Sequence, residues 1–207
     1  MYLNIDIFNK INFKNYLSRQ YLSTFILIIF GIILTHKTIL PLYTSVLIIG
    51  LMYYSYFIHV LFHIIPQKYN PHLSFHHNTE YNSTKNGKII SFIIEALFVN
   101  VGFFLFLYYF QIFINYELFP PILIMYYGII YITVHNINYS VLHIGNHQKH
   151  HLGDNGEITT NFGPDTLDHF LGTNNDSIFE NMYHYTPNIL FSFLITALVF
   201  CNKNDIL

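Results

Sequence analysis

Long apolar runs separated by short polar stretches divide this chain into a small number of expected helices. Four of the runs could cross a bilayer, which requires about 20 apolar residues or somewhat fewer in one helix. They cover residues 21–35, 40–58, 89–110 and 121–142. A fifth run, 189–201, has 13 residues, a length more typical of a re-entrant, interfacial or packed helix. The pattern predicts an all-α integral membrane protein with about four transmembrane helices, and the role of the fifth run stays open.

The connections predict how these helices are paired. A short turn around His36 and Lys37 joins the first two runs, and residues 111–121, which contain no Lys or Arg, join the next two. Two hairpins would then place the amino terminus, residues 64–88 and residues 143–188 on one side of the membrane. These regions hold seven of the nine Lys and Arg residues, which favours the cytoplasmic side. With no internal repeat or low-complexity linker, residues 1–207 are expected to form a single domain.

Composition supports a membrane protein and limits its chemistry. The chain is 53% hydrophobic and 10% charged, whereas soluble domains are about 25% charged. Its net charge of −2 gives no reason to expect a nucleic-acid partner. The single cysteine, Cys201, excludes an internal disulfide and any site built from several thiolates. A bound metal would therefore need nitrogen and oxygen ligands.

Histidines are the main candidates for such ligands. Eleven of the 13 are expected in or beside the cytoplasmic cap, namely His59, His63, His72, His76, His77, His135, His143, His147, His150, His151 and His169. Residues i and i+4 share a helix face, so the spacing of HVLFH and HQKHH aims several rings in one direction. A lone histidine near a helix end is more often a packing residue than a ligand. Three clusters on one membrane face favour metal binding, and eight or more imidazoles suit two metal ions.

Other polar residues carry weaker signals. Glu95 lies about two turns inside an apolar run, where an ionisable group is costly unless it is paired or hydrated. It is expected either to bond a ligand histidine or to pair within the bundle. Asn136 and Asn138, beside His135, either support the site or bond between helices. His36 and His184 are interpreted as ordinary residues, and the roles of His143 and His169 stay open.

The ordered motifs HVLFH, HLSFHH, HNINY, HQKHH and NFGPDTLDHFLGT span about residues 45–173. This series resembles the fatty acid hydroxylase and sterol desaturase superfamily. The resemblance implies a membrane enzyme with a diiron centre, two iron ions held by histidines, which uses O2 and external electrons to hydroxylate or desaturate a lipid C–H bond. Zinc could not perform this reaction because it has no redox chemistry.

Carried over motif by motif, the resemblance implies the individual ligands. His59 and His63 match the first box, His147, His150 and His151 match the last, and His135 matches the histidine that precedes the last box. The middle box is one residue longer than usual, which makes His72 a less certain ligand than His76 and His77. Asn161 and Asp168 match the closing segment together with Gly163, Gly172 and Thr173. Asp168 is expected to orient a ligand histidine or to pack the cap.

The same resemblance implies the partners. The substrate is a membrane lipid, fatty acyl or sterol, and the expected membrane is the endoplasmic reticulum or its equivalent. No nucleotide-binding glycine motif or haem-binding segment is visible, so electrons would come from a b-type cytochrome or a reductase. A set of aromatic residues is expected either to wall the substrate chamber or to anchor the helices at the interface; they are Tyr53, Tyr54, Phe57, Tyr126, Tyr127 and Tyr131.

Two alternatives stay open. One is another oxidation at the same site, such as sterol C4-methyl oxidation or carotenoid hydroxylation. The other is a non-catalytic membrane protein that holds zinc or transports a metal. The metal that purified protein contains distinguishes the second alternative from the enzyme.

Overall fold

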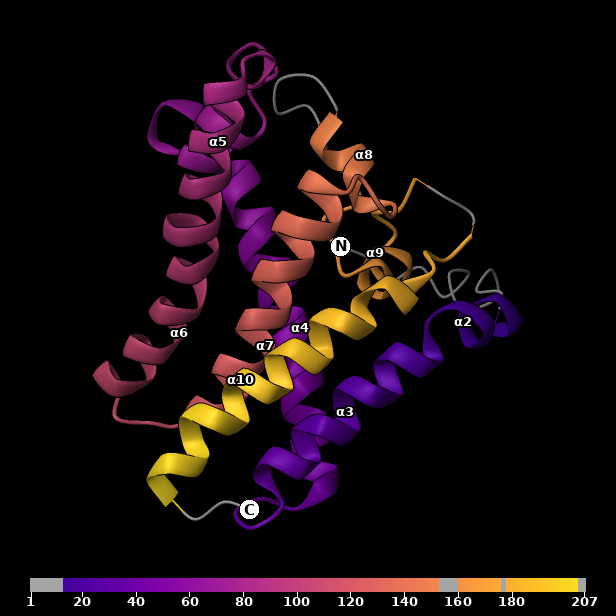
Figure 1. Ribbon diagram of the computed structural model, residues 1–207, viewed down its shortest axis with the longest axis vertical. Coiled ribbons are helices and arrows are strands. Elements are labelled where there is room, and N and C mark those ends of the chain that lie inside the picture. Colours follow the sequence, from indigo (N-terminus) through magenta and orange to yellow (C-terminus); the bar gives the residue numbers. More distant parts are fainter. Residues whose placement is uncertain (1–12, 153–159, 176–177, 205–207) are drawn as a thin grey trace.

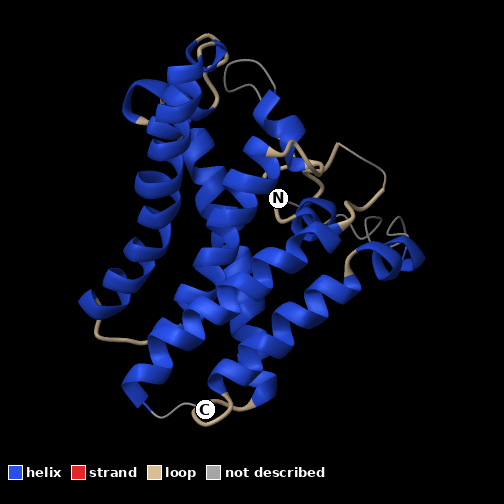
Figure 2. Cartoon of the chain, viewed as in Figure 1, coloured by secondary structure: helices blue, strands red, loops and turns tan. Residues whose placement is uncertain are grey.

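The computed structural model describes residues 13–152, 160–175 and 178–204, which contain helices and loops but no strand (Figures 1 and 2). The α-helices are α2 (Phe13–Arg19), α3 (Tyr21–Thr35), α4 (Pro41–Ile64), α5 (Lys85–Ile93), α6 (Val101–Phe113), α7 (Pro121–Thr133), α8 (His147–Leu152), α9 (Asp165–Leu171) and α10 (Thr186–Asn204). Three segments are π-helical, η2 (His72–His76), η4 (Ile94–Asn100) and η5 (Val134–Val141). Short 3₁₀ turns are η1 (Gln67–Tyr69), η3 (Tyr81–Ser83) and η6 (Met182–Tyr185).

Local sequence signals set the ends of the long helices. Pro41 and Pro121 each occupy the first turn of their helix, where the missing N–H of proline costs nothing. Helix α4 ends at Ile64, and the next residue, Ile65, is extended because the following Pro66 disfavours helical geometry at that position. The hydroxyl of Thr84 accepts a hydrogen bond from the Gly87 N–H at 3.0 Å and caps α5.

The long helices pack around a shared apolar core. Helix α10 lies against α7 and α3, α4 lies against α3 and α7, and α6 covers another side of α7. Ile48, Leu51 and Leu123 are fully buried among them. A Cβ at Gly31 would meet the Cδ1 of Ile48 at 2.3 Å, so glycine leaves room for this side chain where α3 packs against α4.

The chain alternates between the two ends of this bundle. Elements α5, η4 and α6 follow one another without a break, as do α7 and η5. The turns between α3 and α4 and between α6 and α7 lie at the lower end in Figure 1, whereas α5 and α8 lie at the upper end. The histidine-bearing ends of α4, η5 and α8 consequently gather away from the two short turns.

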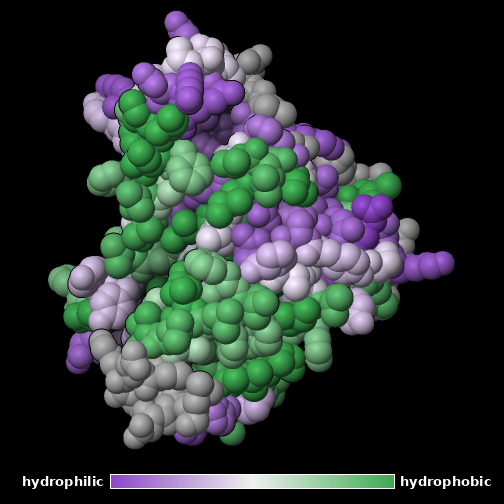
Figure 3. Space-filling model, in the orientation of Figure 1, coloured by the Kyte–Doolittle hydropathy of each residue, from purple (hydrophilic) through white to green (hydrophobic). Residues whose placement is uncertain are grey.

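Within the described residues, three helical stretches are long and apolar enough to cross a membrane, residues 41–64, 85–113 and 182–200. Hydrophobic side chains cover the lower part of the face in Figure 3, and hydrophilic ones gather around the upper end of α5. Phe98, Phe106, Phe113 and Leu198 are among the exposed apolar residues. Because a soluble protein rarely exposes so extensive an apolar surface, the helical membrane class expected from the sequence is supported.

The structure changes one expected boundary. Helix α4 extends beyond the apolar run 40–58 to Ile64, and its last turns carry His59 and His63, as the spacing of HVLFH predicted. The short apolar run 189–201 is part of the 19-residue α10. The helix begins before this run, at Thr186, because the polar residues Thr186 and Asn188 are also helical. By length and composition, the carboxy-terminal helix is therefore a stronger membrane candidate than the 15-residue α3.

Candidate metal centre

All nine histidines predicted as ligands lie in one cluster at the upper end of the bundle. They come from four segments: His59 and His63 from α4, His72, His76 and His77 from η2 and its end, His135 from η5, and His147, His150 and His151 from α8. Neighbouring ring centroids are close, for example 4.3 Å between His76 and His151 and 4.5 Å between His63 and His150. The cluster joins residues that are far apart in the chain.

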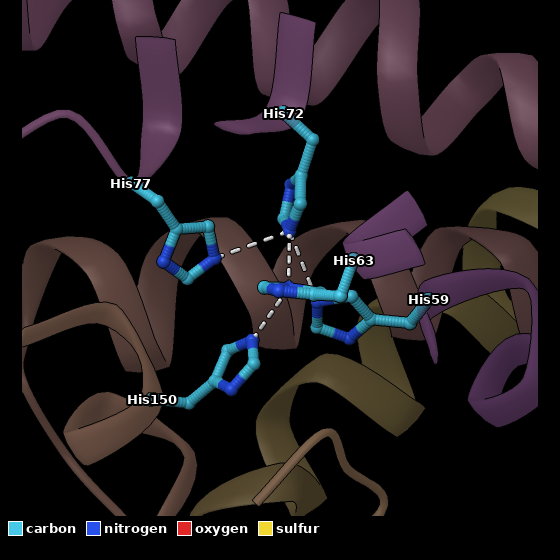
Figure 4. A group of neighbouring side chains, drawn as sticks. All are labelled: His59, His63, His72, His77 and His150. Atoms are coloured by element: carbon cyan, nitrogen blue, oxygen red, sulfur yellow. Dashed lines mark hydrogen bonds between the residues drawn. The ribbon is translucent and has the colours of Figure 1, made fainter. Parts of the chain in front are cut away.

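Five of these rings turn their Nε2 atoms toward a common point and form the five-histidine group, His59, His63, His72, His77 and His150 (Figure 4). The Nε2 of His72 lies 3.1 Å from that of His59, 3.1 Å from that of His63 and 3.2 Å from that of His77. The Nε2 of His150 lies 2.9 Å from that of His63. One ring nitrogen from each residue is thus available to a shared cation.

The extra residue of the middle box is accommodated by π-helical geometry. The His77 N–H donates to the His72 carbonyl at 3.2 Å, an i→i+5 bond. A wider turn brings positions i, i+4 and i+5 to the side that i, i+3 and i+4 share in an α-helix. His72, expected to be the least certain ligand, therefore lies at the middle of the five-histidine group.

Two further groups share members with the first. The Glu95 group consists of His72, His76, Glu95 and His135, and the His147 group consists of His59, His135 and His147. In each, one ligand atom per residue lies within 4.8 Å of all the others. His151 joins the cluster through its Nε2, which is 3.1 Å from the Nε2 of His76. Together, the three groups and His151 offer enough ligand atoms for two neighbouring metal ions.

A row of backbone carbonyls, which we name the carbonyl collar, orients three of the rings. The Nδ1 of His59 donates to the Phe162 carbonyl at 2.7 Å, and that of His150 donates to the Thr160 carbonyl at 2.8 Å. His147 bonds the Asn161 carbonyl in the same way. A proton held at Nδ1 leaves the Nε2 lone pair free for a metal, which is how outer partners fix the tautomer of ligand histidines.

Asp168 holds the carbonyl collar in place without touching a cluster histidine. Its carboxylate accepts hydrogen bonds from the N–H groups of Phe162 at 2.9 Å and Gly163 at 2.7 Å and from the Thr173 hydroxyl at 2.7 Å. Burial raises the pKa of Asp168 to about 7, and these hydrogen bonds oppose the shift. Of the two expected roles, Asp168 fits the packing of the cap, since it acts on the rings only through the loop.

Asn161 contributes mainly through its backbone. Its φ of 54° lies in the left-handed region, which asparagine tolerates better than most residues. Its N–H donates to the Thr173 carbonyl at 2.7 Å, and its side-chain oxygen accepts from the Asn175 N–H at 3.0 Å. The turn directs its carbonyl toward His147.

Glu95 is a direct partner of the cluster, one of the two roles expected from its position. Both carboxylate oxygens lie 3.0 Å from the Nδ1 of His72, and one lies 3.3 Å from the Nε2 of His135. Only 1% of the side chain is exposed. Glu95 and His135 both lie in π-helical segments, η4 and η5, a geometry frequent at functional sites.

The converging ring nitrogens repel one another when no cation lies between them. Burial, followed by repulsion between neighbouring rings, lowers the pKa well below its usual value for His72, His77, His147, His150 and His151. Burial lowers the pKa of His76 to about 4, although the Glu95 carboxylate opposes the shift. Neutral rings with Nδ1 protonated, such as His59 and His72, face each other through two lone pairs 3.1 Å apart. Metal ions placed between such nitrogens remove this repulsion.

The remaining candidate residues lie outside the cluster. His36 is exposed, the Nε2 of His184 lies 2.6 Å from Glu180, and His169 stacks on Phe179 with ring centroids 3.9 Å apart. Asn138 bonds the His184 carbonyl at 2.9 Å, and Asn136 bonds the Ile132 carbonyl at 2.9 Å. Asn138 also donates to the Oδ1 of Asn188 on α10 at 3.0 Å. It therefore bonds between helices, the second of its expected roles, and neither asparagine supports a cluster histidine directly.

Aromatic residues expected to wall a substrate chamber are mostly packed against one another. The Tyr126 hydroxyl donates to the Leu27 carbonyl at 3.1 Å, and the Tyr127 hydroxyl lies 3.1 Å from the Ser55 hydroxyl. Tyr53 and Phe57 are exposed on the outer surface of α4. These residues fill the bundle or face outward, so they serve as packing and surface residues here.

Comparisons with known protein families, with curated proteins and with solved structures find no match for this chain. The case for a function therefore depends on the arrangement of its own side chains.

Replacing Glu95 tests whether the carboxylate supports the metal. We expect Glu95→Ala to lower metal affinity by about 10–100-fold, the usual effect of removing an outer partner of a ligand histidine. Glu95→Gln keeps the size and one acceptor, so its loss should be smaller. Competition with a colorimetric chelator measures both affinities on purified protein. Unchanged metal affinity in Glu95→Ala would show that Glu95 does not support metal binding.

Proposed function

We propose that this protein is an O2-dependent diiron oxidoreductase that hydroxylates or desaturates a membrane lipid, similar to the fatty acid hydroxylase and sterol desaturase superfamily. The observation that carries the proposal is the convergence of nine imidazoles, six of them buried and three partly buried, with several Nδ1 atoms anchored and several Nε2 atoms directed inward. Such a donor set fits divalent transition metals, for which neutral imidazole is a common ligand. Its size favours two ions over one.

Different groups of the chain would bind the metal, orient the ligands and limit access of water in such a centre. The five-histidine group would hold one iron, and other members of the cluster, with His76 and His135 beside Glu95, would hold the second. Bound iron would supply the redox chemistry that activates O2, which no side chain supplies. The carbonyl collar and Glu95 fix ring orientation, and burial of the cluster excludes water. Electrons would come from an external b-type cytochrome or reductase.

The proposal includes an arrangement in the membrane. About four transmembrane helices in two hairpins would carry the histidine cluster as a cap on the cytoplasmic side of an endoplasmic-reticulum-type membrane. The polar upper end and the apolar lower surface of Figure 3 support the placement of the cap outside the lipid. The Lys and Arg distribution supports the cytoplasmic side.

Activity of matched histidine variants tests the function. We expect His63→Ala and His150→Ala to reduce lipid oxidation below detection, because their Nε2 atoms lie 2.9 Å apart in the five-histidine group. His36→Ala, at the opposite end of the bundle, should keep wild-type activity. Lipid profiling of cells expressing each variant provides the measurement. Oxidised lipid at wild-type levels in both cluster variants would contradict the assignment of the site.

Labelling of single cysteines tests the orientation. On a Cys201→Ser background, Ser83→Cys beside the cluster should react with a membrane-impermeant maleimide only after the cytoplasmic face is opened. Lys37→Cys, in the turn between α3 and α4, should show the opposite access. Labelling of both positions from the same side would overturn the hairpin arrangement.

A further inference from the structure

A cavity of about 570 Å³ adjoins the histidine cluster beside α5 and η5. His76 and His151 form part of its wall, and so do Thr79, Asn82, Lys88 and Asn136. Its volume lies within the range of about 300–1,000 Å³ typical of pockets for drug-sized ligands. This cavity therefore reaches the proposed metal site and is large enough for a substrate.

The apolar interior of the bundle offers much less space. A separate cavity beside His135 and His147 measures about 40 Å³. One water needs roughly 10–15 Å³ of such space, so this cavity accommodates only a few small molecules. An acyl chain or sterol ring does not fit there without rearrangement of the core.

The lining of the larger cavity indicates what it binds. Lys88 carries a fixed positive charge there, and no carboxylate in the described part of the chain pairs with it. Asn136 also lines the cavity, and its buried Oδ1 has no hydrogen-bond partner among the described residues, so a polar group of a ligand or a water must satisfy it. Phe92 and Val141 supply an apolar part that is exposed to the surface.

From these features we infer that the cavity binds a single-chain amphiphile with an anionic head group, a carboxylate or a phosphate. The head lies beside Lys88, the first carbons of the chain pass His76 and His151, and the tail leaves past Phe92 and Val141 toward the lipid. This inference deepens the proposed function and rests on it for the claim that the bound molecule is a substrate. It places the oxidised carbon near the head group.

Photochemical labelling of the purified full-length protein in detergent tests this binding site. The probe is palmitate carrying a diazirine on a carbon near the carboxylate, and peptide mass spectrometry locates the labelled residues. We expect labelling of cavity residues that excess palmitate or hexadecyl phosphate suppresses and that hexadecanol does not. Suppression by only one of the two anions identifies the head group.

Two lysines of α5 provide a matched pair of variants. Lys88→Glu should reduce labelling by about tenfold, which corresponds to about 1.4 kcal/mol of binding free energy. Lys85→Glu makes the same change of charge one turn away, at a residue that does not line the cavity. Labelling of the cavity residues in this variant should equal that in the wild type. The bound metal in each variant, measured in parallel, shows whether the fold is kept.

The outcomes separate this inference from the proposed function. Labelling only of outward-facing helix residues, equal suppression by hexadecanol, or equal effects of the two lysine variants would overturn the binding site. Two irons and lipid oxidation with no label in the cavity would leave the proposed function and overturn this inference alone. Labelling of the cavity in a protein that holds no iron would support the binding site and contradict the diiron function.

Discussion

Replacing His72 with alanine is expected to deplete the protein of metal. The change removes one ligand from the five-histidine group and leaves the buried Glu95 without its Nδ1 partner, so it affects both neighbouring groups. Removal of an outer partner alone costs about 10–100-fold in affinity, and removal of a ligand should cost more. Elemental analysis of purified protein should find the metal content reduced by at least about tenfold.

Two further variants make this result interpretable. His143→Ala removes an exposed histidine outside the three groups and should keep the full metal content. His72→Asn leaves a polar side chain near Glu95, which limits the cost of a buried, unpaired carboxylate, and it should still lose metal. Wild-type metal content in both His72 variants would show that the π-turn does not place His72 at the centre of the site.

Asp168→Ala is expected to weaken metal binding although Asp168 touches no cluster histidine. The change leaves the N–H groups of Phe162 and Gly163 and the Thr173 hydroxyl without their acceptor. An unsatisfied buried donor costs about 1–3 kcal/mol, so we expect a loss of about 3 kcal/mol in the free energy of unfolding. The loosened carbonyl collar should lower metal affinity by about 10–100-fold.

Thermal unfolding and chelator competition measure the two effects together. Glu117→Ala changes an exposed carboxylate in the turn between α6 and α7; it is the control and should change neither. Thr173→Val removes one of the three donors and should give a smaller loss than Asp168→Ala. Reduced stability with unchanged metal affinity in Asp168→Ala would show that the carbonyl collar does not orient the rings.

The sequence predicted the long apolar helices well because their signal is local. Residues 21–35 form α3, and residues 121–142 correspond to α7 with η5, which ends at Val141. The apolar run that predicts α4 ends at residue 58 because His59 and His63 lower the hydropathy of the last turns, but their i,i+4 spacing indicated that the helix continues through them, and it does so to Ile64. Polar residues at a helix end mark a change of environment more than a change of secondary structure.

The parts of the site that follow α-helical spacing were predictable from the sequence. HVLFH and HQKHH lie on helices, as their spacing indicated. The role of His72 was underestimated because a comparison with α-helical spacing cannot reveal a π-turn. The pairing of Glu95 stayed open because its partner lies 23 residues away in the chain.

The carbonyl collar has no signature of its own in the sequence. Every residue has a backbone carbonyl, so the positions of Thr160, Asn161 and Phe162 become meaningful only when the loop is folded. The loop depends on the left-handed turn at Asn161 and on the carboxylate of Asp168. Resemblance to a known motif singled out these two residues, and the structure supplies the physical reason.

X-ray absorption at the iron edge, on protein purified with its native metal and quantified by elemental analysis, tests for the proposed diiron centre. We expect about two irons per chain, each surrounded mainly by imidazole nitrogen, with scattering from a second nearby iron. Scattering from the second iron should disappear in His72→Asn and persist in His143→Ala. A protein that holds only zinc, or a single iron with mostly oxygen ligands, would contradict a diiron site built from these histidines.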